Sequence, residues 1–142
     1  GVMAEGIEGP IYIYNNVFYD HDPNAESWMA YIMPQTKDGQ RSNSIVKNNI
    51  FHGGAGTRFT AMEVWGSWNQ HDYNLFYNAG SFSESNGVNG DPLFVNAAAG
   101  NFHLQSTSPA INKGTDVSSI RAVDYEGNPI VGLPDIGAFE YS

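Results

Sequence analysis

The sequence predicts an all-β domain, a solenoid in which short parallel strands of successive coils stack on one another. One pentapeptide, with two Asn followed by an aliphatic residue, Phe and an aromatic ring, occurs at residues 15–19 and 48–52, and a looser copy occupies 73–77. Sixteen Gly and many Asn indicate short segments joined by turns. No window of about 12 residues carries the apolar stripe of an amphipathic helix.

The repeated pentapeptide predicts the same corner in each coil. Its copies are spaced by 33 and 25 residues, within the range of stacked repeats. We expect the repeated Asn side chains to form a hydrogen-bonded ladder where the chain bends, and the repeated Phe rings to stack in the core. The aligned residues are Asn16, Asn49 and Asn74, with Phe18, Phe51 and Phe76. An antiparallel sandwich with coincidental Asn pairs is the alternative.

A second strand-like segment lies between the copies and supports the solenoid. The stretches "SWMAYIM" at 27–33 and "RFTAMEV" at 58–64 align at an offset of 31 residues. This alignment places Trp28 over Phe59, Ala30 over Ala61 and Met33 over Val64. Each coil is therefore expected to contribute two or three short strands.

The C-terminal third has a different pattern, "GDPLFVNAAAGNFHLQSTSPAINKGTD" at 90–116 and "DYEGNPIVGLPDIGAFEY" at 124–141. It resembles the C-terminal end of bacterial right-handed parallel β-helix proteins that act on polysaccharides. The resemblance implies a right-handed parallel β-helix of about three to four coils with a C-terminal closing segment, and a final strand at 134–141. We divide the single domain into repeat coils at 1–89 and the closing segment at 90–142. The resemblance also implies a secreted or cell-surface location.

Charge restricts the partners. Fifteen acidic residues against six Lys and Arg give a formal net charge of −9, so nucleic acids, anionic membranes and polyanionic glycans are poor partners and a neutral ligand fits better. The chain has no Cys, and no apolar run approaches the roughly 20 residues of a membrane span. Its strand-like opening, without a signal peptide, suggests a segment cut from a longer polypeptide.

An aromatic surface is the clearest candidate site. If Met29, Tyr31 and Met33 point inward with Thr60, Met62 and Val64, the alternate residues face solvent. Solvent-facing rings on a flat sheet can stack on the apolar face of a pyranose, with polar neighbours bonding its hydroxyls. The expected carbohydrate-binding residues are Trp28, Phe59, Glu63, Trp65, Trp68 and Tyr73. With the opposite parity, Trp65 lies in the core and this surface is absent.

Catalytic residues are not evident. Hydrolysis of a glycosidic bond uses converging carboxylates, and Glu63 has no carboxylate partner at the aligned position, where Ile32 stands. A lyase would need a base and a group that neutralises a uronate. The fallback set for an enzyme is Lys37, Arg41, Arg58 and Glu63.

A metal site is a weak candidate at "DHDPNAE", because Asp20, Asp22, Asn24 and Glu26 alternate as oxygen ligands do in a calcium loop. The Gly expected midway is absent and Pro23 intrudes, so a plain loop is favoured. The four His residues show no zinc spacing. We expect no cofactor, with calcium as the open alternative.

The sequence thus favours a non-catalytic carbohydrate-binding module for a neutral plant polysaccharide, such as xylan or a related β-glycan. The expected partners are the polysaccharide and a parent glycan-degrading enzyme. Two alternatives remain open. One is a C-terminal fragment of a polysaccharide lyase or β-helix glycoside hydrolase. The other is a structural stub whose N-terminal coil associates with a second chain.

Overall fold

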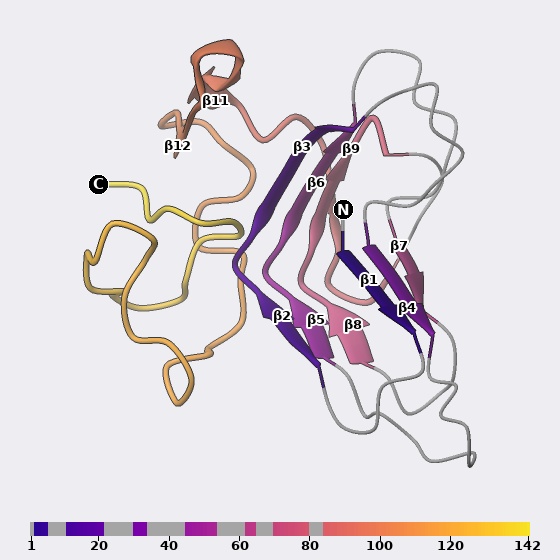
Figure 1. Ribbon diagram of the computed structural model, residues 1–142. Coiled ribbons are helices and arrows are strands. Elements are labelled where there is room, and N and C mark those ends of the chain that lie inside the picture. Colours follow the sequence, from indigo (N-terminus) through magenta and orange to yellow (C-terminus); the bar gives the residue numbers. More distant parts are fainter. Residues whose placement is uncertain are drawn as a thin grey trace.

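The computed structural model describes residues 2–5, 11–21, 30–33, 45–53, 62–64, 70–79 and 84–142. It is an all-β structure in which parallel sheets are followed by a largely irregular C-terminal segment (Figure 1). Side chains are described at 11–19, 45–53, 70–79 and 84–142.

Three parallel sheets contain the repeated strands. The chain passes through them in the same order three times, so that β1–β3, β4–β6 and β7–β9 form three successive repeats. The first sheet holds β1 (Val2–Glu5), β4 (Ala30–Met33) and β7 (Met62–Val64). The second holds β2 (Tyr12–Tyr14), β5 (Ile45–Lys47) and β8 (Gln70–Asp72). The third holds β3 (Val17–His21), β6 (Ile50–Gly53), β9 (Leu75–Tyr77) and β10 (Val88–Asn89).

The register of the third sheet follows the repeated pentapeptide. Phe18 pairs with Phe51, and Phe51 pairs with Phe76, as the sequence alignment predicts. The rings stack with centroids 4.9 and 5.6 Å apart and nearly parallel planes. Strand β10 adds a fourth, shorter copy that the sequence reading missed, with Val88 opposite Leu75.

The register of the first sheet corrects one expectation. Ala30 pairs with Met62 and Tyr31 with Glu63, so the offset between β4 and β7 is 32 residues rather than 31. Glu63 is therefore opposite Tyr31, not Ile32, and the expected grouping of Tyr31 with Met62 is wrong. The two stretches share few identical residues, so residue type alone could not distinguish adjacent registers.

Beyond β10 the parallel pairing ends. An antiparallel hairpin follows, made of β11 (Phe94–Asn96), the 3-10 turn η1 (Ala97–Ala99) and β12 (Asn101–Leu104). Residues 105–142 form turns and one isolated bridge between Val123 and Pro129. The final strand expected at 134–141 is wrong, because these residues pair with no strand.

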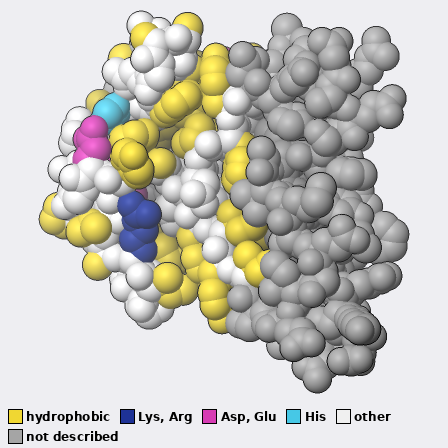
Figure 2. Space-filling view, in the orientation of Figure 1, with side chains coloured by type: hydrophobic (Ala, Val, Ile, Leu, Met, Phe, Trp, Pro, Cys, Tyr) yellow, Lys and Arg dark blue, Asp and Glu magenta, His cyan; other side chains and the backbone are white. Residues whose placement is uncertain are grey.

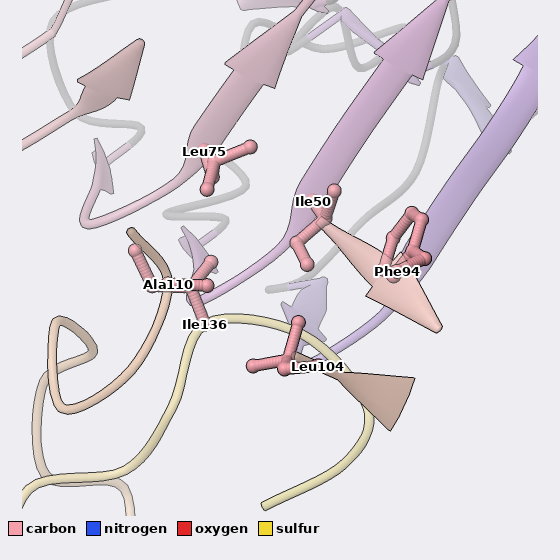
Figure 3. Packing of buried hydrophobic residues seen from close by; sticks show 6 residues of the cluster. All are labelled: Ile50, Leu75, Phe94, Leu104, Ala110 and Ile136. Carbon is pink, nitrogen blue, oxygen red and sulfur yellow. The ribbon is translucent and has the colours of Figure 1, made fainter. Parts of the chain in front are cut away.

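The C-terminal segment covers one face of the third sheet. Along β3, β6 and β9, the residues on either side of the stacked Phe point to this face, and the hairpin and the terminal residues pack over them (Figure 3). The buried cluster consists of Ile50, Leu75, Phe94, Leu104, Ala110 and Ile136. The C-terminal segment therefore buries this face of the third sheet.

Polar contacts fix the segment to the bends between the second and third sheets. Asn48 Oδ1 accepts a hydrogen bond from the Thr115 N–H at 2.8 Å, and Asn48 Nδ2 donates to the Thr115 carbonyl at 2.9 Å. The Gly137 N–H donates to the Asn48 carbonyl at 2.8 Å. Asn48 is fully buried, so these bonds satisfy polar groups that water does not reach.

Candidate functional site

An amide ladder links the three repeats where the second strand of each bends into the third. The N–H and Nδ2 of Asn16 donate to Asn49 Oδ1 at 3.0 and 3.1 Å. The same two groups of Asn49 donate to Asn74 Oδ1 at 2.9 and 3.0 Å. Asn49 and Asn74 are fully buried, so replacing either leaves buried donors and acceptors without partners.

The bend itself depends on a left-handed residue just before each ladder Asn. Asn15, Asn48 and Tyr73 have φ of 52°, 58° and 58°, and Asn86 repeats this conformation at 55° before β10. Asn adopts this region more readily than most residues. The double Asn of the pentapeptide therefore supplies a left-handed residue followed by a ladder residue.

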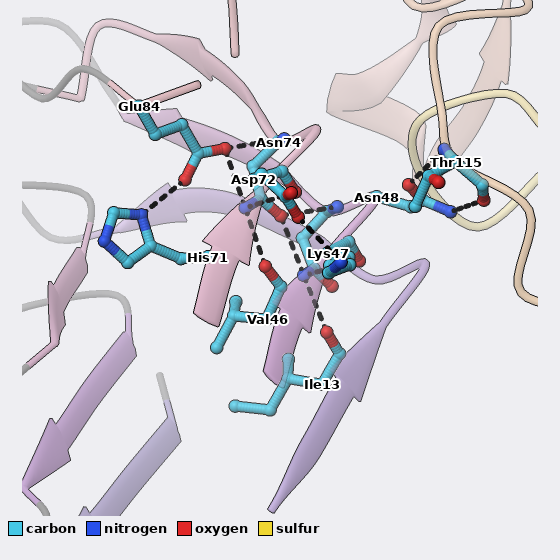
Figure 4. Close-up of polar contacts among 10 residues, drawn as sticks. Ile13, Val46, Lys47, Asn48, His71, Asp72, Asn74, Glu84 and Thr115 are labelled. Atoms are coloured by element: carbon cyan, nitrogen blue, oxygen red, sulfur yellow. Dashed lines mark hydrogen bonds and ion pairs between the residues drawn. The ribbon is translucent and has the colours of Figure 1, made fainter. Parts of the chain in front are cut away.

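Glu84 closes the ladder after the third repeat. Its Oε1 accepts hydrogen bonds from the N–H and Nδ2 of Asn74 at 2.7 and 2.9 Å, and its Oε2 lies 2.8 Å from His71 Nδ1 (Figure 4). Gly87 stands at the position that Asn occupies in the earlier repeats. A Cβ there would lie 2.9 Å from Glu84 Cγ, so the missing side chain makes room for the carboxylate. The sequence reading did not find this role for Glu84.

The outer face of the second sheet is the clearest surface for a ligand among the described residues. Ile13 and Val46 are buried, and the alternate positions of β2, β5 and β8 point outward. We call this surface the Tyr12–Tyr14 face; its residues are Tyr12, Tyr14, Ile45, Lys47, Gln70 and Asp72. Figure 2 shows hydrophobic side chains running over the region of β2 and β3.

The rings of the two tyrosines of this face are stacked on each other. Their ring centroids are 6.0 Å apart, with only 12° between the planes. Tyr12 is 56% exposed and Tyr14 is partly buried. Burial, and secondarily the neighbouring Tyr12, raises the pKa of the Tyr14 hydroxyl above its ordinary value. The Tyr14 hydroxyl is therefore neutral at physiological pH and can donate a hydrogen bond.

Polar groups lie beside the rings. Lys47 lies opposite Tyr14 on the neighbouring strand β5, and its Nζ lies 3.1 Å from Asp72 Oδ1. Gln70 is exposed at the end of the row that begins with Tyr12. The face thus combines aromatic surface with amide, ammonium and carboxylate groups, and the charges of Lys47 and Asp72 offset each other.

A second exposed aromatic cluster lies on the C-terminal segment. Tyr125 is 73% exposed and contacts Phe139 edge-on, with ring centroids 5.6 Å apart. The His103 ring lies 4.4 Å from Phe139, and His103 Nε2 lies 3.2 Å from Glu126 Oε2. Tyr125 and Phe139 are on irregular backbone, so this surface lacks the regular row spacing of a sheet.

None of the six carbohydrate-binding residues expected from the sequence belongs to the Tyr12–Tyr14 face. Tyr73 is a left-handed bend residue and is partly buried. The backbone of Glu63 lies in β7. The other four, Trp28, Phe59, Trp65 and Trp68, lie outside the described residues. The sequence reading also overlooked Tyr12 and Tyr14, although the alternation in "IYIY" could have indicated them.

Asp124, Asp135 and Glu140 of the C-terminal segment accept hydrogen bonds from backbone N–H groups. Asp124 accepts hydrogen bonds from Glu126, Asn128 and Glu140 at 2.8–3.2 Å. Asp135 accepts from the N–H groups of Asn112 and Tyr141, both at 2.7 Å. Glu140 accepts from the Asp135 N–H at 3.0 Å. The fallback catalytic residues Lys37, Arg41 and Arg58 lie outside the described residues.

Metal ligands are not brought together in the described part of the chain, where no group of three or more His, Asp or Glu is arranged to hold an ion. Of the calcium candidates, Asp20 lies in β3 without a described side chain, and Asp22, Asn24 and Glu26 lie outside the described residues. No helix among the described residues is long and apolar enough to cross a membrane.

No protein-family model matches the chain, and no curated protein matches its sequence. The polysaccharide-active family suggested by residues 90–141 therefore stays a prediction.

Proposed function

We propose that the chain is a short right-handed parallel β-helix that serves as a non-catalytic carbohydrate-binding module. Three observations support the helix: the sheets are parallel, the chain visits them in a fixed cyclic order, and an amide ladder joins the repeats. Right-handed crossovers are strongly preferred between parallel strands. The ligand we propose is a neutral plant polysaccharide, such as xylan or a related β-glycan.

The observation that carries this function is the Tyr12–Tyr14 face. The two rings are stacked with nearly parallel planes, and the exposed Tyr12 ring offers apolar surface for the C–H face of a sugar residue. Gln70, Lys47 and Asp72 supply donors and acceptors for hydroxyl groups. The regular backbone of three paired strands holds these groups in fixed rows, which limits the conformational entropy lost on binding.

The charge of the chain supports a neutral ligand. A formal net charge of −9 repels polyuronates, and the single cation of the face is paired with Asp72. The four aromatic residues expected from the sequence that lie outside the described residues remain part of the proposal as a second aromatic surface: Trp28, Phe59, Trp65 and Trp68. Attachment to a secreted glycan-degrading enzyme also belongs to the proposal.

Depletion binding tests the function. The chain is mixed with insoluble xylan, cellulose or pectin, and the protein left in solution is measured. We expect depletion by xylan or another neutral glycan and little by pectin. Depletion by none of the neutral glycans would contradict the proposal. An ultraviolet assay for unsaturated sugars, run on the same mixtures, would reveal a lyase instead.

A further inference from the structure

We propose that Asp72 is a specificity-determining residue of the Tyr12–Tyr14 face. Its carboxylate holds the Lys47 ammonium in an ion pair, and this pairing makes the face discriminate against glycans that carry carboxylate groups. The inference rests on the proposed function, because it concerns which glycans that face accepts. The ligand class that it defines is a polysaccharide without uronate groups at the site of contact.

The ion pair is set by the register of the second sheet. Lys47 in β5 and Asp72 in β8 lie directly opposite each other, and Lys47 Nζ is 3.1 Å from Asp72 Oδ1 (Figure 4). The two side chains are only 20% and 27% exposed. Water therefore screens this pair less than it screens an ion pair in full contact with solvent, and the two charges offset each other strongly.

Among the described residues, Lys47 alone compensates the charge of Asp72. The Oδ1 atom of Asp72 is shielded from solvent, and no N–H or O–H group is aligned to donate a hydrogen bond to it. A uronate that drew the Lys47 ammonium away would leave this oxygen without a compensating group. Because an uncompensated charge out of water is costly, the pair resists opening to an anionic ligand.

The Asp72 carboxylate does not hold the backbone in the way that other carboxylates of the chain do. Asp124 accepts hydrogen bonds from the N–H groups of Glu126, Asn128 and Glu140. In the described part of the chain, the Asp72 side chain has one polar contact, the ion pair with Lys47. A partly buried ion pair adds little to stability, because desolvation offsets the attraction. We therefore assign its effect to what the face binds.

The local pair, rather than the net charge, decides this discrimination. At physiological ionic strength the Debye length is about 8 Å, so most of the formal net charge of −9 is screened at the site of contact. Lys47 is the only cation among the residues of the face, and it lies opposite Tyr14, beside the stacked rings. Its ammonium, if unpaired, would attract a carboxylate on a sugar bound there. Paired with Asp72, it presents no net charge.

Removal of the Asp72 charge tests the proposal. Isothermal titration calorimetry measures the binding of two probes, xylohexaose and a xylo-oligosaccharide of the same length that carries one glucuronate branch near its centre. The variants are Asp72→Asn, which keeps the shape of the side chain, and Asp72→Ser, which removes the same charge with a smaller group. The matched control is the double variant Lys47→Gln/Asp72→Asn, which removes both charges together.

We expect the unaltered chain to bind the neutral probe at least as tightly as the acidic one. Asp72→Asn and Asp72→Ser should raise the affinity for the acidic probe, relative to the neutral one, by about fivefold or more, because Lys47 is then free to bind the carboxylate. The gain should shrink in 1 M NaCl, where the Debye length falls to about 3 Å. The double variant should show no gain, because it lacks the cation.

An unchanged preference in both Asp72 variants, with xylohexaose still bound, would overturn this inference and leave the proposed function standing. An equal gain in the double variant would also overturn it, because Lys47 would then not be the group that binds the carboxylate. Binding of neither probe by the unaltered chain would contradict the proposed function, and this inference with it.

Discussion

Asn49 shows how much one side chain contributes to this structure. Its amide accepts from Asn16, donates to Asn74, and also reaches the carbonyls of Ile13 and Lys47 at 2.9 Å. Asn49 is fully buried, so water cannot replace its amide as the hydrogen-bond partner of Ile13, Lys47 and Asn74. The spacing of the two Asn pairs in the sequence was enough to predict the ladder, because both backbone bend and side-chain bonding require the same residue type.

Asn49→Asp should destabilise the fold by about 3–5 kcal/mol, because a buried carboxylate would face three acceptor oxygens without a cation. Urea denaturation at neutral pH measures the loss. Asn16→Asp is the matched control: Asn16 is exposed at the end of the ladder, so its loss should be clearly smaller. Equal losses for both variants would contradict the role of the buried ladder.

Glu84 is a residue that the sequence could not assign. Glu84 belongs to none of the three repeats. It reaches Asn74 because the chain turns back there and because Gly87, at the position of a ladder Asn, leaves space for the Glu84 side chain. Glu84→Ala should destabilise the fold by about 2 kcal/mol or more, since it leaves two donors of a buried Asn unsatisfied. Glu84→Gln keeps the acceptor for Asn74 and should recover part of this loss. Thermal denaturation of both variants measures the loss in Glu84→Ala and the recovery in Glu84→Gln.

Asp124 gives the C-terminal segment a dependence on pH. Burial tends to raise the pKa of its carboxyl, but hydrogen bonds from Asn128, Glu140 and Glu126 outweigh it, so the pKa lies below the ordinary 3.8. Its stabilisation is therefore complete above that value and is lost as pH falls through the lower folded-state pKa. Glu140 acts in the opposite sense, because burial raises its pKa above 4.5.

Asp124→Asn should lower stability near neutral pH by about 2 kcal/mol, through loss of charge-assisted hydrogen bonds. It should also reduce the loss of stability that the unaltered chain suffers as pH falls below 3.8, the ordinary pKa of this carboxyl. Urea denaturation at neutral and acid pH measures both effects. A variant that follows the same acid profile as the unaltered chain would contradict the assigned role.

Among the elements, the third sheet is the most strongly determined. Its aromatic stack is identical in residue type from β3 to β9, and its register is the one that the repeats predict. The register of β4 with β7 was missed by one residue, because those strands share apolar character without shared anchors. The terminal strand was wrong for a related reason: residues 134–141 are anchored by Asp135 and Glu140 side chains rather than by a neighbouring strand.

Phe51→Ala should destabilise the sheet by about 3–5 kcal/mol, because it opens a cavity in the middle of the stack. Phe18→Ala removes a ring of the same size from the partly buried end, so its effect should be smaller. Chemical denaturation of the pair compares the two positions. If Phe18→Ala were the more damaging change, the order of burial along the stack would be wrong.

At the scale of the whole molecule, the C-terminal segment and the repeats form one core. Gly137 has φ of 113°, and a Cβ there would lie 2.8 Å from Ile50 Cδ1. Gly137→Ala should therefore destabilise the contact by about 1–3 kcal/mol through overpacking and backbone strain. Gly127→Ala is the control: φ is also positive at 89°, but nothing lies within 4 Å. Similar urea midpoints for both variants would argue against close packing on Ile50.

The whole-molecule division between repeats and C-terminal segment could be anticipated from the change of pattern near residue 90. The candidate site could be anticipated only in kind. An aromatic surface on an outward sheet face was expected, but the sequence gives no way to rank faces without knowing which strands lie together. Ile13 is buried and pairs with the buried Val46, so Tyr12 and Tyr14 on either side of it point outward.

The most direct test of the account is a binding isotherm for xylan with two matched variants. Tyr12→Ala removes an exposed ring from the Tyr12–Tyr14 face, and Tyr125→Ala removes an exposed ring from the irregular C-terminal surface. We expect Tyr12→Ala to weaken binding by about tenfold, as loss of a stacking ring of 1–2 kcal/mol implies, and Tyr125→Ala to leave it unchanged. Unaltered binding of Tyr12→Ala, or no binding by the unaltered chain, would contradict the proposed site.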